Sequence, residues 1–121
     1  MKILENAIYK LLANVSNMTN IMPSFITEPP GIAYTITPLT GGVVKQSQLE
    51  VRVISNDIDN ALETNALIED ALDMTQNKKS LEIDGIILRS QQAGGASPNF
   101  QDGPQVWEIS RYYIITWRCK D

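Results

Sequence analysis

Hydrophobic and polar positions follow a helical rhythm in two segments of this chain. In the N-terminal segment, apolar residues recur at three- and four-residue spacing and so share one stripe of a helix. The stripe consists of Ile3, Leu4, Ala7, Ile8, Leu11, Leu12 and Val15. A second helix is predicted from Asn56 or Asp57 to about Met74, in a stretch rich in Ala, Leu and Glu and free of Gly and Pro. Asn65 and Glu69 fall among its apolar residues, so we expect a narrow buried face.

Four other segments show the period-two alternation of β-strands. They are residues 32–37, 43–54, 82–90 and 105–118. Gly41 and Gly42 lie between the first two and supply the backbone freedom of a hairpin turn. The last segment places Trp107, Ile109, Tyr113, Ile115 and Trp117 on one face. Arg111 falls on the same face, and a β-bulge at this residue would explain it.

The remaining residues form connections, two of which are long for so small a chain. Residues 19–31 contain three prolines, and residues 91–104 contain several glycines and prolines, so both are predicted to be loops. A polar linker is predicted at 75–80. Loops of this length commonly bind something or become ordered on assembly. Their candidate contact residues are Phe25, Gly94, Gly95, Asn99 and Phe100, although the two aromatic rings could equally fold back onto their own domain.

The order helix, strand, strand, helix, strand, strand predicts an α+β fold of the αββαββ type. We expect a four-stranded, mainly antiparallel sheet with two helices packed on one face, connected by the long loops. A chain of 121 residues fits one domain, residues 1–121. The uncovered face would carry Val106, Tyr112, Ile114 and Ile87, which suggests a partner there, though ordinary surfaces are also about half apolar.

The amino-acid composition excludes several kinds of binding and catalytic site. Ten Lys and Arg against fourteen Asp and Glu give a net charge of −4, which opposes binding to phosphate backbones. The chain has no histidine and one cysteine, Cys119, so Ser-His-Asp triads, internal disulfides and the usual zinc sites are excluded. No apolar run is long enough for a membrane span. We therefore expect a protein made in the cytoplasm that is not an enzyme and has no cofactor or metal.

Two further patterns have ordinary explanations. Gly41 to Lys45 superficially resembles a phosphate-binding loop, but the lysine lies inside a predicted strand and not at a helix N-terminus, so a turn is favoured. Neighbouring acids such as Asp57 and Asp59, or Asp70 and Asp73, have no calcium-loop spacing and fit the solvated face of a helix.

Three stretches of the chain resemble minor structural proteins of siphophages and prophages, specifically the tail-terminator or tail-completion group. They are the hairpin from Tyr34 to Ser55, the Ala93-Gly94-Gly95 segment, and Gln105-Val106-Trp107-Glu108. The likeness extends over most of the chain. It implies the αββαββ arrangement and a hexameric ring that sits on the finished tail tube, ends its growth and offers a docking surface to the head connector.

The resemblance also implies partners and a location, the virion tail. The partners would be other copies of the chain, the tail tube protein and the head connector protein. The long loops would contact the tube or connector, and Ile87, Tyr112 and Ile114 would meet neighbouring subunits. Glu50 and Glu108 could line a channel through which DNA passes without specific binding, because like charges repel. They could also be ordinary solubilising residues.

Two other functions stay open from the sequence. The first is a head-completion or stopper component of the connector, which would also be small and rich in loops. The second is a small-molecule-binding α+β domain in which the Gly94-Gly95 loop closes over a ligand.

Overall fold

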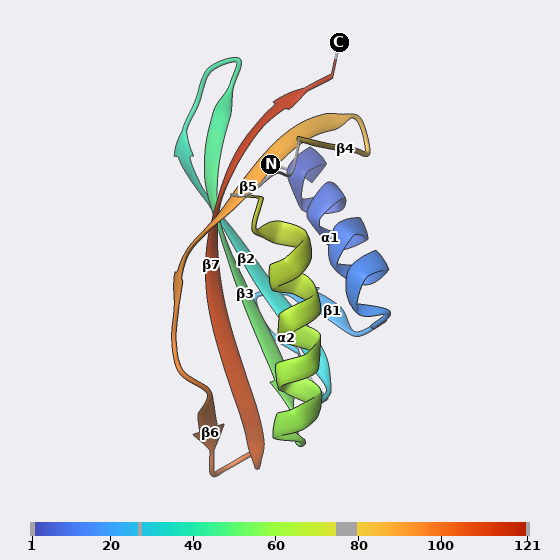
Figure 1. Ribbon diagram of the computed structural model, residues 1–121, viewed down its shortest axis with the longest axis vertical. Coiled ribbons are helices and arrows are strands. Elements are labelled where there is room, and N and C mark those ends of the chain that lie inside the picture. The colour runs from blue at the N-terminus through green and yellow to red at the C-terminus, as the bar shows by residue number, and fades with distance from the viewer. Residues whose placement is uncertain (1, 27, 75–79, 121) are drawn as a thin grey trace.

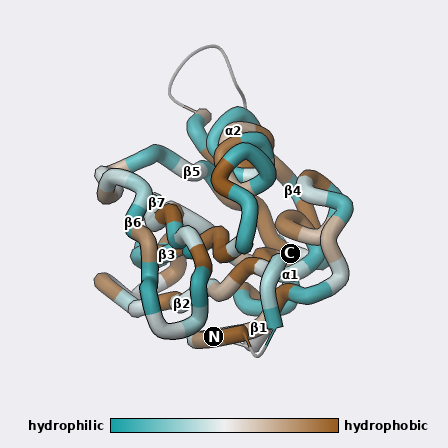
Figure 2. Tube along the Cα trace, turned by 90° about the horizontal axis from the view of Figure 1, so that it is seen from below, coloured by the Kyte–Doolittle hydropathy of each residue, from teal (hydrophilic) through white to brown (hydrophobic). Residues whose placement is uncertain are grey.

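The helical and alternating segments fold into two helices and one sheet in a computed structural model that describes residues 2–26, 28–74 and 80–120. In chain order the elements are α1 (Lys2–Ser16), β1 (Ile21–Pro23), β2 (Gly31–Thr40), β3 (Lys45–Ser55), α2 (Ile58–Leu72), β4 (Leu81–Ile83), β5 (Ile86–Gly95), β6 (Asn99–Gln101) and β7 (Val106–Cys119). Figure 1 shows both helices on the same face of a long, twisted sheet. Seen along the long axis, the sheet curls like half a barrel beside them (Figure 2).

The sheet has seven strands, so the predicted four-stranded, mainly antiparallel sheet is wrong. The strand order is β1-β2-β3-β7-β5-β4, and β6 also pairs with β7. The sheet is mixed, because β1 pairs parallel to β2 while the other pairs are antiparallel. The four central strands, β2, β3, β5 and β7, overlap the predicted ones, and the three-residue strands β1, β4 and β6 extend the sheet. The overall class is α+β.

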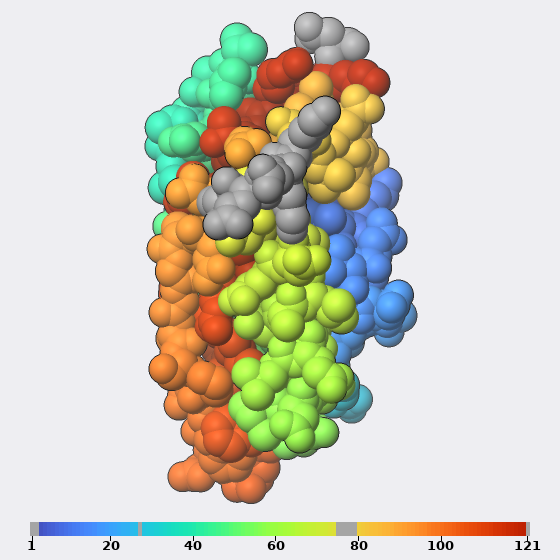
Figure 3. Space-filling view, in the orientation of Figure 1, coloured from blue at the N-terminus to red at the C-terminus, as the bar shows by residue number. Residues whose placement is uncertain are grey.

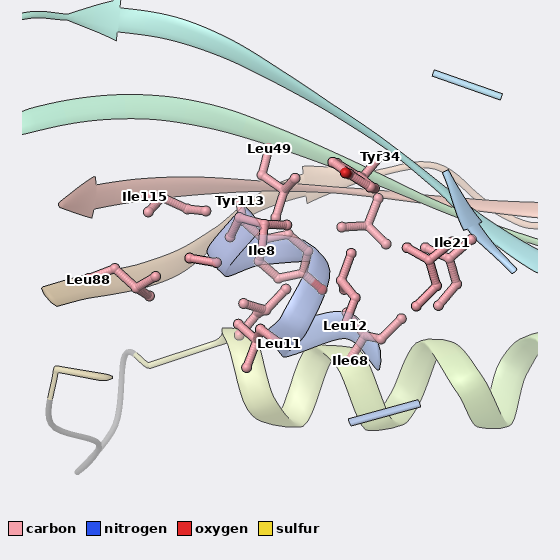
Figure 4. Close-up of a cluster of buried hydrophobic side chains, with 14 of the residues drawn as sticks. Ile8, Leu11, Leu12, Ile21, Tyr34, Leu49, Ile68, Leu88, Tyr113 and Ile115 are labelled. Carbon is pink, nitrogen blue, oxygen red and sulfur yellow. The ribbon is translucent and has the colours of Figure 1, made fainter. Parts of the chain in front are cut away.

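The core lies between the helices and the covered face of the sheet. Helix α1 contributes most of its predicted stripe, although Ile3 at its start is 51% exposed. Helix α2 contributes a narrow buried face that includes Asn65, as its interrupted pattern predicts. Figure 4 shows side chains of both helices meeting the sheet around the ring of Tyr113, which is fully buried. Burial of this continuous apolar cluster is the main stabilising term of the fold.

Arg111 does not mark a bulge. The pairing of β3 with β7 runs without interruption from Lys45 opposite Trp117 to Ser55 opposite Trp107. Arg111 lies on the helix-covered face because its charge is compensated there, with its Nε 2.5 Å from Oε1 of Glu69 on α2. The irregularity lies instead on β5, where the register with β7 shifts between Gln92 and Gly94.

Both predicted long loops contain strands. Residues 91–104 include the end of β5 and all of β6, and residues 19–31 include β1. The segment 82–90 is also more than one strand, because β4 and β5 form a hairpin around Asp84 and Gly85, both with positive φ. The predicted linker at 75–80 lies, apart from Ser80, outside the described residues.

Candidate interaction surfaces

The face of the sheet opposite the helices has a polar centre. Residues at alternate positions of β2, β3 and β7 form its rows, and the register sets Thr35 beside Glu50 and Glu50 beside Tyr112. The next row contains Gln48 beside Ile114. A hydrogen bond to Glu50, reinforced by the negative charge of that carboxylate, raises the pKa of Tyr112 above its ordinary value. Hydroxyl, amide and carboxyl groups therefore dominate the centre of this face.

The structure brings together only two of the three apolar residues expected at a subunit interface on this face. Tyr112 and Ile114 lie two residues apart on β7 and are half-buried. Ile87 is opposite Arg118, four residues further along β7 than Ile114. Their role in subunit contact stays a prediction, and the patch they would form is divided by polar residues.

Glu50 and Glu108 share this face but do not form a row of like charge. Arg52 lies between them in the register and pairs with Glu108, with 3.5 Å between its Nη1 and Oε1 of the carboxylate. Arg52 also donates a hydrogen bond to the carbonyl of Ser24. Because a cation separates the two carboxylates, repulsion of DNA by this face would be weaker than the sequence alone suggests. Their place in a channel stays a prediction.

Phe25 lines a pocket at one end of the uncovered face, and 62% of its surface is exposed. The pocket has a volume of about 380 Å³ and lies between the β1–β2 connection, the end of β3 and the β6–β7 turn. Its walls are Phe25, Ile26, Pro29, Arg52, Ile54, Gln101, Pro104, Val106 and Glu108. We call it the Phe25 pocket. Val106 is on the uncovered face, as predicted, yet it is only 5% exposed because these segments surround it.

The other predicted contact residues lie along β5 and β6. Phe100 packs on Trp107, with ring centroids 5.0 Å apart, so this ring folds back onto its own sheet. Asn99 pairs with Glu108 in the β6–β7 register. Gly94 and Gly95 end β5 and border a wide-open hollow of about 410 Å³ beside Arg111. Because these glycines belong to a strand paired with β7, the prediction that they form a loop is wrong. Ligand binding beside them stays a prediction.

Sequence reasoning missed the most exposed apolar group among the described residues, at the tip of the β2–β3 hairpin. Val43 is 83% exposed, Val44 is 55% exposed and Leu39 is 47% exposed. Figure 1 shows this hairpin extending past the helices, so nothing on either helix covers it. We call Leu39, Val43 and Val44 the hairpin tip. The sequence feature that could have indicated this group is the pair of valines directly after Gly41 and Gly42, at positions where a turn is usually polar.

Contacts with Trp117 hold the part of β3 next to the hairpin tip. Trp117 on β7 is 5% exposed and donates a hydrogen bond from Nε1 to Oγ of Ser47, at 3.2 Å. The ammonium group of Lys45 lies 5.1 Å from the centroid of the Trp117 ring, a cation–π contact. Hollows of about 290 and 360 Å³ lie on the two sides of the hairpin, and Trp117 borders both.

Other chemistry-bearing groups do not assemble into a site within the described ranges. No cluster of three or more potential ligand side chains there could hold a metal ion, and no described helix is long and apolar enough to cross a membrane. Cys119 is an exposed free thiol. Among the described residues, the buried hydroxyl of Tyr113 and the side-chain oxygen of Asn65 have no hydrogen-bond partner, and burial raises the pKa of Tyr113.

Comparison with known proteins finds similarity to solved structures but not to known sequence families. No protein-family model matches the sequence, and no curated protein matches it. A chain of a solved structure titled "Virion of native gene transfer agent (GTA) particle" has a similar fold, with a TM-score of 0.64. The alignment covers 96% of this chain and 95% of that chain at 13% sequence identity. At this identity the match establishes a shared fold over nearly all of both chains.

Proposed function

We propose that this chain is a structural protein of a phage-type virion. The observation that carries the proposal is the fold shared, almost end to end, with a chain of the gene transfer agent virion. Near-complete coverage of both chains matters, because it compares whole subunits and not a common substructure within larger proteins. The sequence resemblance to siphophage and prophage minor structural proteins points in the same direction.

Within that class we propose the role of a tail terminator. Copies of the chain would form a hexameric ring on the tail tube, end its growth and present a surface to the head connector, while DNA passes through without specific binding. The proposal includes no reaction and no cofactor. Contact surfaces at both ends of the sheet, the hairpin tip and the Phe25 pocket, are what a ring subunit with several partners requires.

A stopper or head-completion component is the second candidate. The similar chain belongs to a gene transfer agent virion, and the match gives no position of that chain within the particle, so the fold similarity is compatible with both roles. The two differ in the defect that loss of the protein causes. Without a terminator, tubes grow past their normal length and stay unjoined, whereas without a stopper, tails have normal length and heads lose DNA.

The experiment is deletion of the gene in a cell that produces the particle, followed by electron microscopy of the lysate. We expect overlong tails separated from filled heads, and normal particles when the gene is restored on a plasmid. Gold labelling of an epitope tag should place the protein at the tail end nearest the head. Tails of normal length together with emptied heads would support the stopper. Absence of the chain from purified particles would refute both.

A further inference from the structure

The two ends of the sheet carry opposite charge. Around the hairpin tip, segments 38–45, 87–89 and 116–120 contain Lys45, Arg89, Arg118 and Lys120 and no Asp or Glu. Arg89 and Arg118 border the same hollow as Val44. The neighbouring β4–β5 hairpin contributes two acids, Glu82 and Asp84, which pair with Lys120 and Lys10. The surplus of basic over acidic side chains at this end therefore comes from Lys45, Arg89 and Arg118. The apolar hairpin tip therefore projects from a basic surface.

The Phe25 pocket lies in an acidic surface at the other end. Segments 24–30, 52–63 and 99–108 contain Glu28, Asp57, Asp59, Glu63, Asp102 and Glu108. Arg52 is the single Lys or Arg of these segments in the sequence, and it is paired with Glu108. The partial positive charge at the N-terminus of α2 offsets some of this negative charge, but the surplus of carboxylates is larger. The charged residues of the pocket wall itself are Glu108 and its partner Arg52, and the other carboxylates belong to the segments around the pocket, which we call the acidic rim.

The two surfaces complement each other in both polarity and charge. One presents aliphatic side chains, 47–83% exposed, within a basic rim, and the other presents an open apolar pocket of about 380 Å³ within an acidic rim. Burial of apolar side chains supplies affinity, and opposite potentials supply orientation and a faster encounter. We propose that the hairpin tip of one copy of this chain inserts into the Phe25 pocket of a second copy.

The geometry makes this contact head-to-tail. Ile54, in the pocket, is nine positions along β3 from Lys45, which directly follows the hairpin tip, so the two surfaces are roughly 30 Å apart at ~3.3 Å per residue. In Figure 3 the hairpin and the β6–β7 turn occupy opposite ends of the molecule. A copy cannot fill its own pocket, and each copy offers one tip and one pocket. Repetition of such a contact gives a closed ring or an open chain. This inference rests on the proposed function insofar as it names the contact that would hold the ring together.

Disulfide trapping tests the contact. In a Cys119→Ser background, one protein carries Val43→Cys at the tip and a second carries Pro104→Cys in the pocket wall. Both positions are exposed, so the variants should fold as the parent does. Under mild oxidation at high protein concentration, we expect a covalent dimer when the two proteins are mixed and little from either alone. A protein carrying both cysteines should give a ladder of oligomers, in solution and in purified particles.

A matched control moves the second cysteine to the outer surface of α2, as Ala66→Cys, which is also exposed. It should not cross-link to Val43→Cys. Equal cross-linking with either partner, or within each single variant, would mean random collision and would overturn the proposal, as would no cross-linking in solution and in particles. If the purified protein cross-links but the chain is absent from virions, the proposed function is refuted and this contact stands. If the chain is found at the tail end but does not cross-link, this contact is refuted and the proposed function stands.

Discussion

Gly95 is required by the close approach of Arg111. A methyl group added at Gly95 would lie 2.6 Å from Cδ of Arg111 and 2.7 Å from the carbonyl oxygen of Ser110. Arg111 cannot move away easily, because it is bonded to Glu69 and to the carbonyl of Ala96. We expect Gly95→Ala to lower the free energy of unfolding by about 1–3 kcal/mol, measured by urea denaturation. Gly103→Ala, with open space around the added methyl, should change it by less than about 0.5 kcal/mol.

The buried hydroxyl of Tyr113 should make the free energy of unfolding fall at alkaline pH. Its buried hydroxyl favours the neutral form, so its pKa in the folded protein lies above the ordinary value of about 10. The unfolded chain loses this proton first as pH rises, so the unfolded state binds fewer protons and stability falls above about pH 10, by up to ~1.4 kcal/mol per pH unit. When the free energy of unfolding is measured against pH, Tyr113→Phe should lack this part of the decrease. At neutral pH the same change should cost little, because the hydroxyl has no partner in the described structure. An identical alkaline slope in both proteins would contradict the assignment.

Among the elements, α2 depends on its N-terminal cap. The Asp57 side chain accepts a hydrogen bond from the backbone N–H of Asp59, at 3.0 Å, and so satisfies one of the free donors of the first turn. We expect Asp57→Ala to destabilise the protein by about 1 kcal/mol in thermal or urea unfolding. Asp57→Asn is the matched control, because asparagine caps helices about as well as aspartate. Equal losses in the two variants would mean that the charge, and not the hydrogen bond, is what matters.

The elements also show what a single sequence can and cannot predict. Long periodic segments, such as the stripe of α1 and the alternation of β3, were predictable because many residues repeat one pattern. Strands β1, β4 and β6 have three residues each, too few to display a period, and their pairing partners are distant in sequence. Gly94 and Gly95 suggested a loop because glycine weakens strands, but their pairing with β7 overrides that preference. Asp84-Gly85 was a readable turn signal inside a segment interpreted as one strand.

At the scale of the whole molecule, the surfaces were harder to predict than the core. Phe25 was identified because an aromatic ring in a proline-rich connection has few neighbours, and it does border a pocket. The ion pair between Arg52 and Glu108 was not predictable, because strand register brings Arg52, two residues after Glu50 on β3, beside a residue of β7. The opposite charges of the two ends cannot be read from the net charge of −4, because each end collects residues from three separate parts of the chain.

Association of folded copies should make the melting temperature depend on protein concentration. A partner that binds only the folded state at ~100 times its Kd stabilises that state by about 2.7 kcal/mol. We therefore expect Tm to rise as the protein is concentrated, and to rise less at high salt, which screens the opposite charges of the two ends.

Val43→Asp should abolish the rise in Tm with protein concentration, because it places a carboxylate on the hairpin tip where the acidic rim of the Phe25 pocket would meet it. Leu67→Asp makes a similar change at a half-exposed position of α2 and should keep the rise. If both variants retain the dependence on concentration, the copies associate through a surface other than the hairpin tip.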